Sequence, residues 1–147
     1  MAKTAQLKPE FVEHIPQNLD EGTIYISIEF ATAIHKCCCG CGSEIVTPFS
    51  PIQWQLTFDG KSVTLYPSIG NWGLPCRSHY WVKQNNVVWS YQMTESEILA
   101  GRSYDAAARR AYNEGKDIPD PAEVVETLPK EGNRRWSLWN WIAEFFG

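Results

Sequence analysis

The chain has 147 residues, a length typical of one domain. Hydrophobic residues make up 44% and charged residues 20%, a balance that excludes a disordered or a fibrous protein. The net charge of −4 leaves no basic stripe, so we predict no nucleic-acid partner. No stretch approaches the roughly 18 apolar residues of a membrane span, and residues 1–8 lack the apolar middle of a signal peptide. We therefore expect a cytoplasmic protein that has no membrane partner.

The first part of the chain changes from a proline-containing segment to a strand pattern. Residues 1–22 hold two prolines and a turn-like stretch at 18–22, which predicts an irregular lead-in. In residues 23–30 the apolar side chains recur at every second position. They are Ile24, Ile26, Ile28 and Phe30. This alternation is typical of a half-buried β-strand.

The next seventy residues carry repeated strand and turn signals. Further strands are expected at residues 43–47, 52–58, 62–66, 79–83 and 87–91. Asp59 and Gly60 predict a two-residue hairpin turn between the second and third of these. Residues 84–86 predict a second hairpin turn, because Asn tolerates the left-handed backbone. Residues 23–93 are therefore expected to form a small antiparallel β domain.

Helical signals replace strand signals after this point. Thr94 and Glu97 have the spacing of a capping box, so a short helix is expected to begin at Glu95. A second helix is expected over residues 103–114, and it ends at Gly115. A linker is expected over 116–133, with one helical turn at 122–127. An aromatic helix is expected over 135–146. We expect residues 94–147 to pack on the same domain, with the aromatic helix docked on the protein's own sheet or on a protein partner.

Five cysteines are the strongest chemical signal in the chain. Four lie within residues 37–41, and Cys76 and His79 follow about 35 residues later. An odd, tightly clustered set in a cytoplasmic chain favours metal binding over disulfides. Structural zinc takes four Cys or His ligands, and the glycines at 40 and 42 permit the sharp turn that adjacent ligands require. The candidate ligands are Cys37, Cys39, Cys41, Cys76 and His79.

These candidates exceed the four ligands that zinc needs, so spacing alone leaves the ligand set open. Cys37, Cys39 and Cys41 project alike from an extended segment, whereas Cys38 and Cys41 fit the tighter Cys-x-x-Cys spacing. A structural zinc clip would join residues 35–42 to the segment before the strand at 79. The alternatives are a catalytic zinc with Glu44 as acid or base, and free or redox-active cysteines. A zinc deaminase is excluded, because the His-x-Glu half of that motif is missing upstream of Pro75.

Few residues can serve as bases in a reaction without metal chemistry. The imidazoles are those of His14, His35 and His79. We expect His14 to be a packed surface residue, and His35 to be a plain strand-end residue, with a metal ligand or a group that orients a ligand as the alternatives. Ser68 lies on a Gly-containing turn after a strand, where a hydroxyl can be presented as a nucleophile. If four thiols hold the metal, His79 is free to act as the general base for Ser68. If His79 is a metal ligand, that mechanism fails.

Two alternatives to a Ser68–His79 pair stay open at this point, and a Ser78–His79 pair is not expected. Ser68 and Asn71 can simply close a turn by bonding their own backbone. Ser78 is adjacent to His79, and neighbouring residues of a strand point to opposite faces, so these two are not expected to pair. A thiolate near the metal, from Cys37 or Cys38, is the third possible nucleophile.

Four motifs carry a resemblance to a known family. They are residues 11–16, 35–42, 66–72 and 75–81. In this order they resemble a bacterial family of small proteins of unknown function with a predicted metal site, and the match covers roughly residues 10–100. Members of that family are often encoded beside a ubiquitin-like protein and E1-like and E2-like enzymes, in operons linked with phage defence. Some members have Pro or Ala at the position of Cys38, which by resemblance makes Cys38 the spare thiol.

The resemblance implies a zinc-binding component of a bacterial ubiquitin-like modification pathway. Its partners would be the ubiquitin-like protein and the E1-like and E2-like enzymes. One implied role is a peptidase that processes or deconjugates the modifier, for which Ser68 and His79 are the candidate catalytic residues. The alternative is a noncatalytic, zinc-stabilised adaptor or an E3-like binding module. For the fold, we predict the α+β class: a small antiparallel β-sheet domain clipped by a zinc site, with short C-terminal helices.

Overall fold

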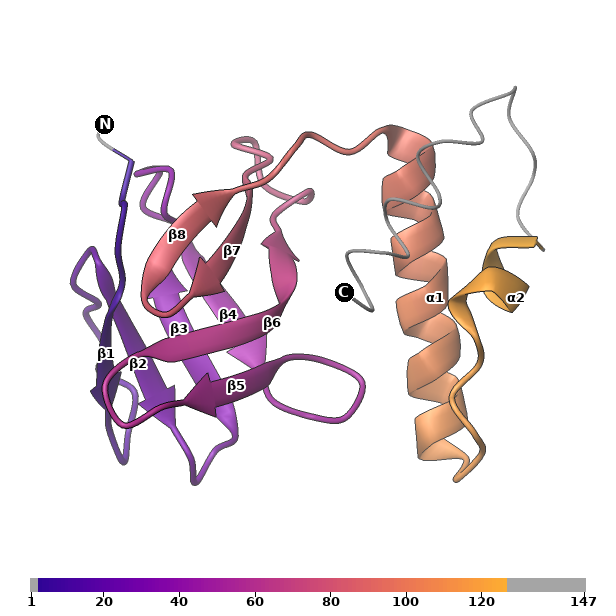
Figure 1. Ribbon diagram of the computed structural model, residues 1–147, viewed down its shortest axis with the longest axis horizontal. Coiled ribbons are helices and arrows are strands. Elements are labelled where there is room, and N and C mark those ends of the chain that lie inside the picture. The colour runs from indigo at the N-terminus through magenta and orange to yellow at the C-terminus, as the bar shows by residue number, and fades with distance from the viewer. Residues whose placement is uncertain (1–2, 127–147) are drawn as a thin grey trace. The chain divides into compact units, whose positions relative to one another are not determined.

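The computed structural model describes residues 3–126 of the chain (Figure 1). The chain divides into two compact units between Gln92 and Met93. The first unit contains the strands β1 Lys8–Phe11, β2 Thr23–Ser27, β3 Thr32–Lys36, β4 Glu44–Pro48, β5 Gln55–Phe58, β6 Val63–Gly70, β7 His79–Lys83 and β8 Asn86–Trp89. The second contains the helices α1 Glu95–Asn113 and α2 Pro121–Glu126. The α+β class predicted from the sequence is confirmed.

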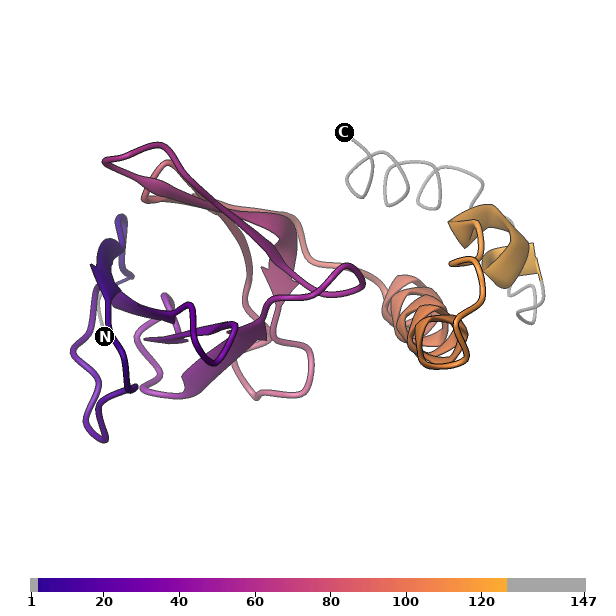
Figure 2. The ribbon, with the colours of Figure 1, turned by 90° about the horizontal axis from the view of Figure 1, so that it is seen from below.

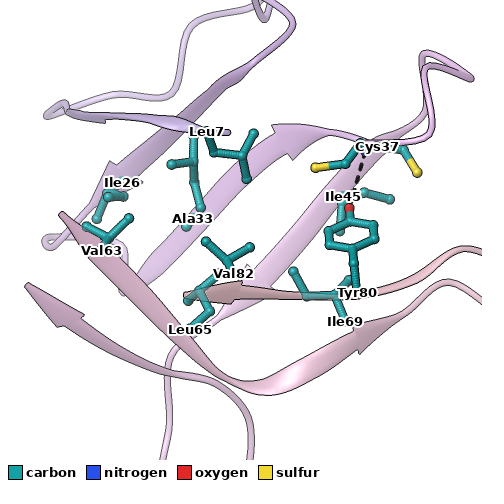
Figure 3. Close-up of a cluster of buried hydrophobic side chains, with 12 residues drawn as sticks. Leu7, Ile26, Ala33, Cys37, Ile45, Val63, Leu65, Ile69, Tyr80 and Val82 are labelled. Atoms are coloured by element: carbon teal, nitrogen blue, oxygen red, sulfur yellow. Dashed lines mark hydrogen bonds between the residues drawn. The ribbon is translucent and has the colours of Figure 1, made fainter. Parts of the chain in front are cut away.

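The strands form two sheets rather than one. Each sheet has four strands, in the orders β1-β2-β3-β4 and β5-β6-β7-β8 (Figures 1 and 2). Every neighbouring pair is antiparallel except β1 and β2, which run parallel. Buried side chains from both sheets meet in one core (Figure 3). Its members include Ile24, Ile26, Ala33 and Ile45 from the first sheet and Val63, Leu65, Ile69, Tyr80 and Val82 from the second.

The prediction of an irregular lead-in over residues 1–22 was wrong for Lys8–Phe11. This segment forms β1, an outer strand of the first sheet, which pairs with β2. Pro9 is compatible with an outer strand because it lacks a backbone N–H that a second neighbour would need. Counting prolines therefore underestimated the strand content of this segment.

The strand predicted over residues 23–30 is shorter and more buried than its pattern indicated. β2 ends at Ser27, and all five of its residues are buried. The segment before β2 covers the face that was expected to be exposed: the backbone N–H of Asp20 donates to the Tyr25 hydroxyl at 3.1 Å, and the Ser27 hydroxyl donates to the Glu13 carbonyl at 3.2 Å. Ile28, which continues the alternation, is 67% exposed in the turn that follows.

Both predicted hairpins are present in the second sheet, but the first has a different turn. Residues 59–62 form that turn, so Asp59 and Gly60 are not its two central residues. The Asp59 carboxylate accepts from the backbone N–H groups of Lys61 at 2.9 Å and Ser62 at 2.6 Å, which moves the bend one residue along the chain. In the β7–β8 turn, Gln84 and Asn85 both have positive φ angles, as the prediction for Asn requires.

The second unit contains one long helix where two were predicted. α1 runs without a break from Glu95 to Asn113. It begins at the predicted capping box, in which Thr94 accepts from the Glu97 backbone and Glu97 accepts from the Thr94 backbone. Gly101 lowers helix propensity by only about 1 kcal/mol, so it does not end a helix that buries one face. Those buried residues are Glu97, Ile98, Ala100, Tyr104 and Ala108.

The described residues cover only some of the remaining helical predictions. Gly115 adopts the predicted left-handed conformation after α1, at φ +67°, and α2 coincides with the helical turn expected at 122–127. The aromatic helix predicted over 135–146 lies outside the described residues. The packing of residues 94–147 on the β domain stays a prediction. Within residues 3–126, no helix is long and apolar enough to span a membrane.

Candidate active site and metal centre

The register of β6 against β7 brings Ser68 beside His79. Gly70 is the cross-strand partner of His79, and paired residues face the same side of a sheet. Ser68 lies two residues before Gly70 and therefore shares that face. A register shift between Leu65 and Ile69, which contains the cis peptide bond before Pro67, separates this end of β6 from the regular ladder. The result is a distance of 2.9 Å between Ser68 Oγ and His79 Nε2.

The other ring nitrogen of His79 determines its tautomer. His79 Nδ1 lies 2.7 Å from the backbone carbonyl oxygen of Tyr91. A carbonyl can only accept, so Nδ1 carries the hydrogen, and Nε2 of the neutral ring is left to accept from the Ser68 hydroxyl. His79 is only 2% exposed, whereas Ser68 is partly exposed. The imidazole is thus shielded from water on most sides, and the serine that it contacts is only partly buried.

Aromatic rings hold the imidazole in place. The Trp72 ring packs edge to face against His79 at a centroid distance of 5.1 Å, and the Tyr91 ring lies at 5.8 Å. Gly70 permits the close approach of Trp72: a Cβ atom at this position would collide with the indole nitrogen. Glycine is therefore favoured at position 70 because a side chain there would collide with Trp72, and not because the backbone has a positive φ angle.

The second group of reactive side chains is the cysteine cluster, which we define as Cys37, Cys39, Cys41 and Cys76. Their sulfur atoms all lie within 4.8 Å of one another, and within the described residues this group can hold a metal ion. Tetrahedral zinc with Zn–S bonds of about 2.3 Å separates its sulfurs by roughly 3.8 Å. The Cys37 sulfur lies 3.4 Å from that of Cys39 and 3.9 Å from that of Cys76, which agrees with that spacing. The donor set thus fits a zinc ion.

Two turns bring these sulfurs together. Gly40 and Gly42 have φ angles of +90° and +82°, and the Gly40 N–H donates to the Cys37 carbonyl at 3.1 Å. The Cys37 N–H donates to the Ser43 carbonyl at 2.8 Å, which closes the loop between β3 and β4. On the other side, the Arg77 N–H donates to the Leu74 carbonyl at 3.1 Å, so Cys76 lies within a turn before β7.

The cysteines of the cluster differ in electrostatic environment. Burial raises the pKa of Cys37, and a hydrogen bond with Ser78 partly opposes this effect. Cys41 is exposed, and hydrogen bonds from the Ser43 side chain and backbone lower its pKa to about 6. Metal ligation requires thiolates, so a metal ion that binds here must displace protons, chiefly from Cys37 and Cys39, whose pKa values are raised by burial.

The other sequence candidates lie elsewhere. Cys38 is fully buried and outside the cluster, and burial raises its pKa to about 12, which disfavours a thiolate nucleophile. His35 is also fully buried; its Nε2 lies 2.8 Å from the Tyr80 hydroxyl, and burial lowers the pKa of the imidazole to about 4. Figure 3 shows Tyr80 reaching across the core toward the Cys37 end. His14 is exposed against Phe30, and Glu44 is exposed on β4.

Some contacts of this region had no sequence signal. The orienting group for His79 is the Tyr91 carbonyl, and a backbone carbonyl is present at every residue. Likewise, Ser78 and Asn71 contact the sulfur of Cys37, a pairing that depends on how two loops meet. His79, a predicted metal ligand, lies outside the cluster, with each of its ring nitrogens in a hydrogen bond.

A hydroxyl that donates to an imidazole, which in turn donates to a fixed acceptor, is the arrangement that serine hydrolases use to activate a nucleophile. Residues 11–90, more than half of the chain, match the family model described as the bacterial ubiquitination-like system serine protease, BubE. The chain belongs to the BubE family. This confirms the resemblance to a family of ubiquitin-like conjugation operons. No curated protein and no solved structure gives a significant match.

Proposed function

We propose that the protein is a serine peptidase that processes or deconjugates the ubiquitin-like modifier of its pathway. Ser68 is the nucleophile and His79 the general base. The observation that carries this assignment is the continuous contact from Ser68 Oγ through both nitrogens of His79 to the Tyr91 carbonyl, at 2.9 Å and 2.7 Å. The family description independently names a serine protease.

The reaction follows from these positions. His79 Nε2 takes the hydroxyl proton as Ser68 Oγ bonds to the scissile carbonyl carbon, and the Tyr91 carbonyl stabilises the imidazolium through Nδ1–H. The C–N bond then breaks, and the leaving amine takes the proton from Nε2. Water attacks the acyl ester next, with its proton passing through the same nitrogen back to Ser68 Oγ. The modifier is released with a free carboxylate.

The cysteine cluster supports a separate, structural role for zinc. Four sulfurs at tetrahedral spacing complete the ligand set, so no position remains for a catalytic water. His79 is then free for proton transfer, the condition on which the serine mechanism depends. Zinc, when bound, would supply a crosslink between the β3–β4 loop and the turn before β7.

The partners proposed from the family are the ubiquitin-like protein and its E1-like and E2-like enzymes, in a pathway linked with phage defence. The test is cleavage of a bacterial ubiquitin-like precursor that carries a C-terminal reporter peptide. Ser68→Ala should abolish cleavage with folding and zinc content unchanged, and Ser62→Ala, which removes a hydroxyl in the β5–β6 turn, should leave cleavage intact. Equal cleavage by wild type and Ser68→Ala would overturn the serine mechanism, and an absence of cleavage by the zinc-loaded wild type would favour the adaptor role.

A further inference from the structure

We propose that Asn71 and Ser78 are positioning residues through which the cysteine cluster sets the geometry of the Ser68–His79 pair. This inference rests on the proposed function, because it assigns both residues to the same reaction. Asn71 directly follows β6 and Ser78 directly precedes β7. Along the chain, Asn71 therefore lies between Ser68 and Cys76, and Ser78 lies between Cys76 and His79.

On the cluster side, the contacts are short and shielded. Ser78 Oγ lies 3.1 Å from the Cys37 sulfur and 3.5 Å from the Cys76 sulfur, and Ser78 is 4% exposed. The Asn71 side-chain amide donates to Ser78 Oγ at 2.8 Å and lies 3.8 Å from the Cys37 sulfur. Two polar side chains thus converge on the thiols that join the two cysteine loops.

The direction of these hydrogen bonds follows from which atoms carry a hydrogen to donate. An amide N–H only donates, so the Ser78 oxygen accepts from Asn71 and its own hydrogen is free to donate. A metal-bound thiolate has no hydrogen, so it can only accept. Metal binding therefore fixes one orientation, with Asn71 donating to Ser78 and Ser78 donating to Cys37. Hydrogen bonds to a charged acceptor are the stronger kind, so the link is tightest when metal is bound.

On the catalytic side, the same residues continue the ladder that pairs the two strands. The Asn71 N–H donates to the Ser78 carbonyl at 2.8 Å, directly after the Gly70–His79 pair. Ser78 is covalently adjacent to His79, and adjacent residues of an extended chain face opposite sides. One side chain of this dipeptide therefore faces the cluster and the other faces Ser68. A shift of Ser78 relative to Asn71 would change the distance between Ser68 and His79.

The variants Ser78→Ala and Asn71→Ala test this link, with Ser62→Ala as the control. Outer hydrogen-bond partners of metal ligands typically contribute about 10–100-fold to metal affinity. We expect Ser78→Ala to release zinc to a chelator at least about tenfold faster than wild type, and Asn71→Ala to show a smaller increase. In Ser78→Ala, the maximal rate at which a fluorophosphonate probe labels Ser68 should be at least about tenfold lower than in wild type. The half-saturating probe concentration should stay within about twofold of the wild-type value.

A second readout does not depend on activity. The ¹⁵N chemical shift of His79 Nε2 reports its hydrogen bond with Ser68, and at saturating zinc it should change in Ser78→Ala but not in Ser62→Ala. Unchanged zinc release in both test variants would overturn the link to the cluster. An unchanged labelling rate together with an unchanged Nε2 shift would overturn the positioning role.

These outcomes separate the inference from the proposed function. If wild type is not labelled at Ser68, the proposed peptidase mechanism is wrong, and the Nε2 shift and zinc release still decide whether Ser78 connects the two groups. If Ser78→Ala fails to fold, Asn71→Ala decides instead, because Asn71 is partly exposed whereas Ser78 is buried.

Discussion

Ser68 Oγ and His79 Nε2 lie 2.9 Å apart on neighbouring strands, and Gly70, two residues after Ser68, is the cross-strand partner of His79. Because Gly70 carries no side chain, the Trp72 indole can lie against it and pack on the imidazole. The space that glycine leaves is thus occupied by the Trp72 indole, whose ring also packs against His79.

Gly70→Ala should damage both stability and activity. The added methyl group would collide with the Trp72 indole, which contacts His79, and overpacking of this kind typically costs about 1–3 kcal/mol. Denaturant unfolding gives the change in free energy, and probe labelling of Ser68 gives the change in activity. Gly73→Ala is the matched control, because an added Cβ atom there meets nothing within 4 Å. Equal stability of the two variants would contradict the role assigned to Gly70.

Replacing His79, the proposed general base, should affect the chemical step more than the fold. His79→Gln keeps polar atoms at this position but cannot take the Ser68 proton, so we expect cleavage to fall by roughly 10²–10⁴-fold. Zinc content should stay at the wild-type level, because the proposed ligands are the four clustered cysteines. Elemental analysis and steady-state cleavage measure the two quantities. Loss of zinc with His79→Gln would instead identify His79 as a metal ligand.

Metal binding should depend on Cys76 and not on Cys38. Cys76→Ser removes one of the four proposed ligands, so the variant should lose zinc and, at zinc concentrations about 100 times the wild-type Kd, about 2.7 kcal/mol of stability. Cys38→Ala should keep a full equivalent of zinc, because Cys38 is buried outside the cluster. Metal analysis and thermal unfolding with and without chelator distinguish the two variants. A full zinc equivalent in Cys76→Ser would contradict the four-cysteine site.

The capping box should stabilise α1 without contributing to the chemistry. Thr94→Ala removes the acceptor for the Glu97 N–H, which typically costs about 1 kcal/mol. Thr94→Ser keeps the hydroxyl and should retain most of this stability. Circular dichroism at increasing temperature measures the loss of helix, and Ser68 labelling should stay unchanged in both variants. Lower labelling of folded Thr94→Ala would show that α1 acts on the catalytic unit.

Local patterns were sufficient for several features of the fold and site. The β7–β8 turn followed from Gln84 and Asn85, the start of α1 followed from Thr94 and Glu97, and the α+β class followed from the order of the segments. In each case the physical cause acts over a few residues: backbone conformation at a turn, or a side chain that bonds the nearest free N–H group.

Other features could not be read from local patterns because distant segments decide them. The burial of Tyr25 depends on the segment around Asp20 that covers it, and the formation of β1 depends on the neighbouring strand. The continuity of α1 through Gly101 depends on the burial of one helix face, which outweighs a small propensity cost.

The sequence by itself determined which residues have reactive chemistry: four clustered thiols and Cys76, Ser68 in a turn motif after a strand, and His79. Residue type alone sets that chemistry, so no coordinates were needed to name the candidates. Only the tertiary structure decided which of these residues lie in the cysteine cluster and which lie in the Ser68–His79 contact. It assembled Cys37, Cys39, Cys41 and Cys76 around one point and gave His79 its contacts with Ser68 and the Tyr91 carbonyl. Pairing register and loop closure place these atoms, and both depend on contacts between residues far apart in the chain.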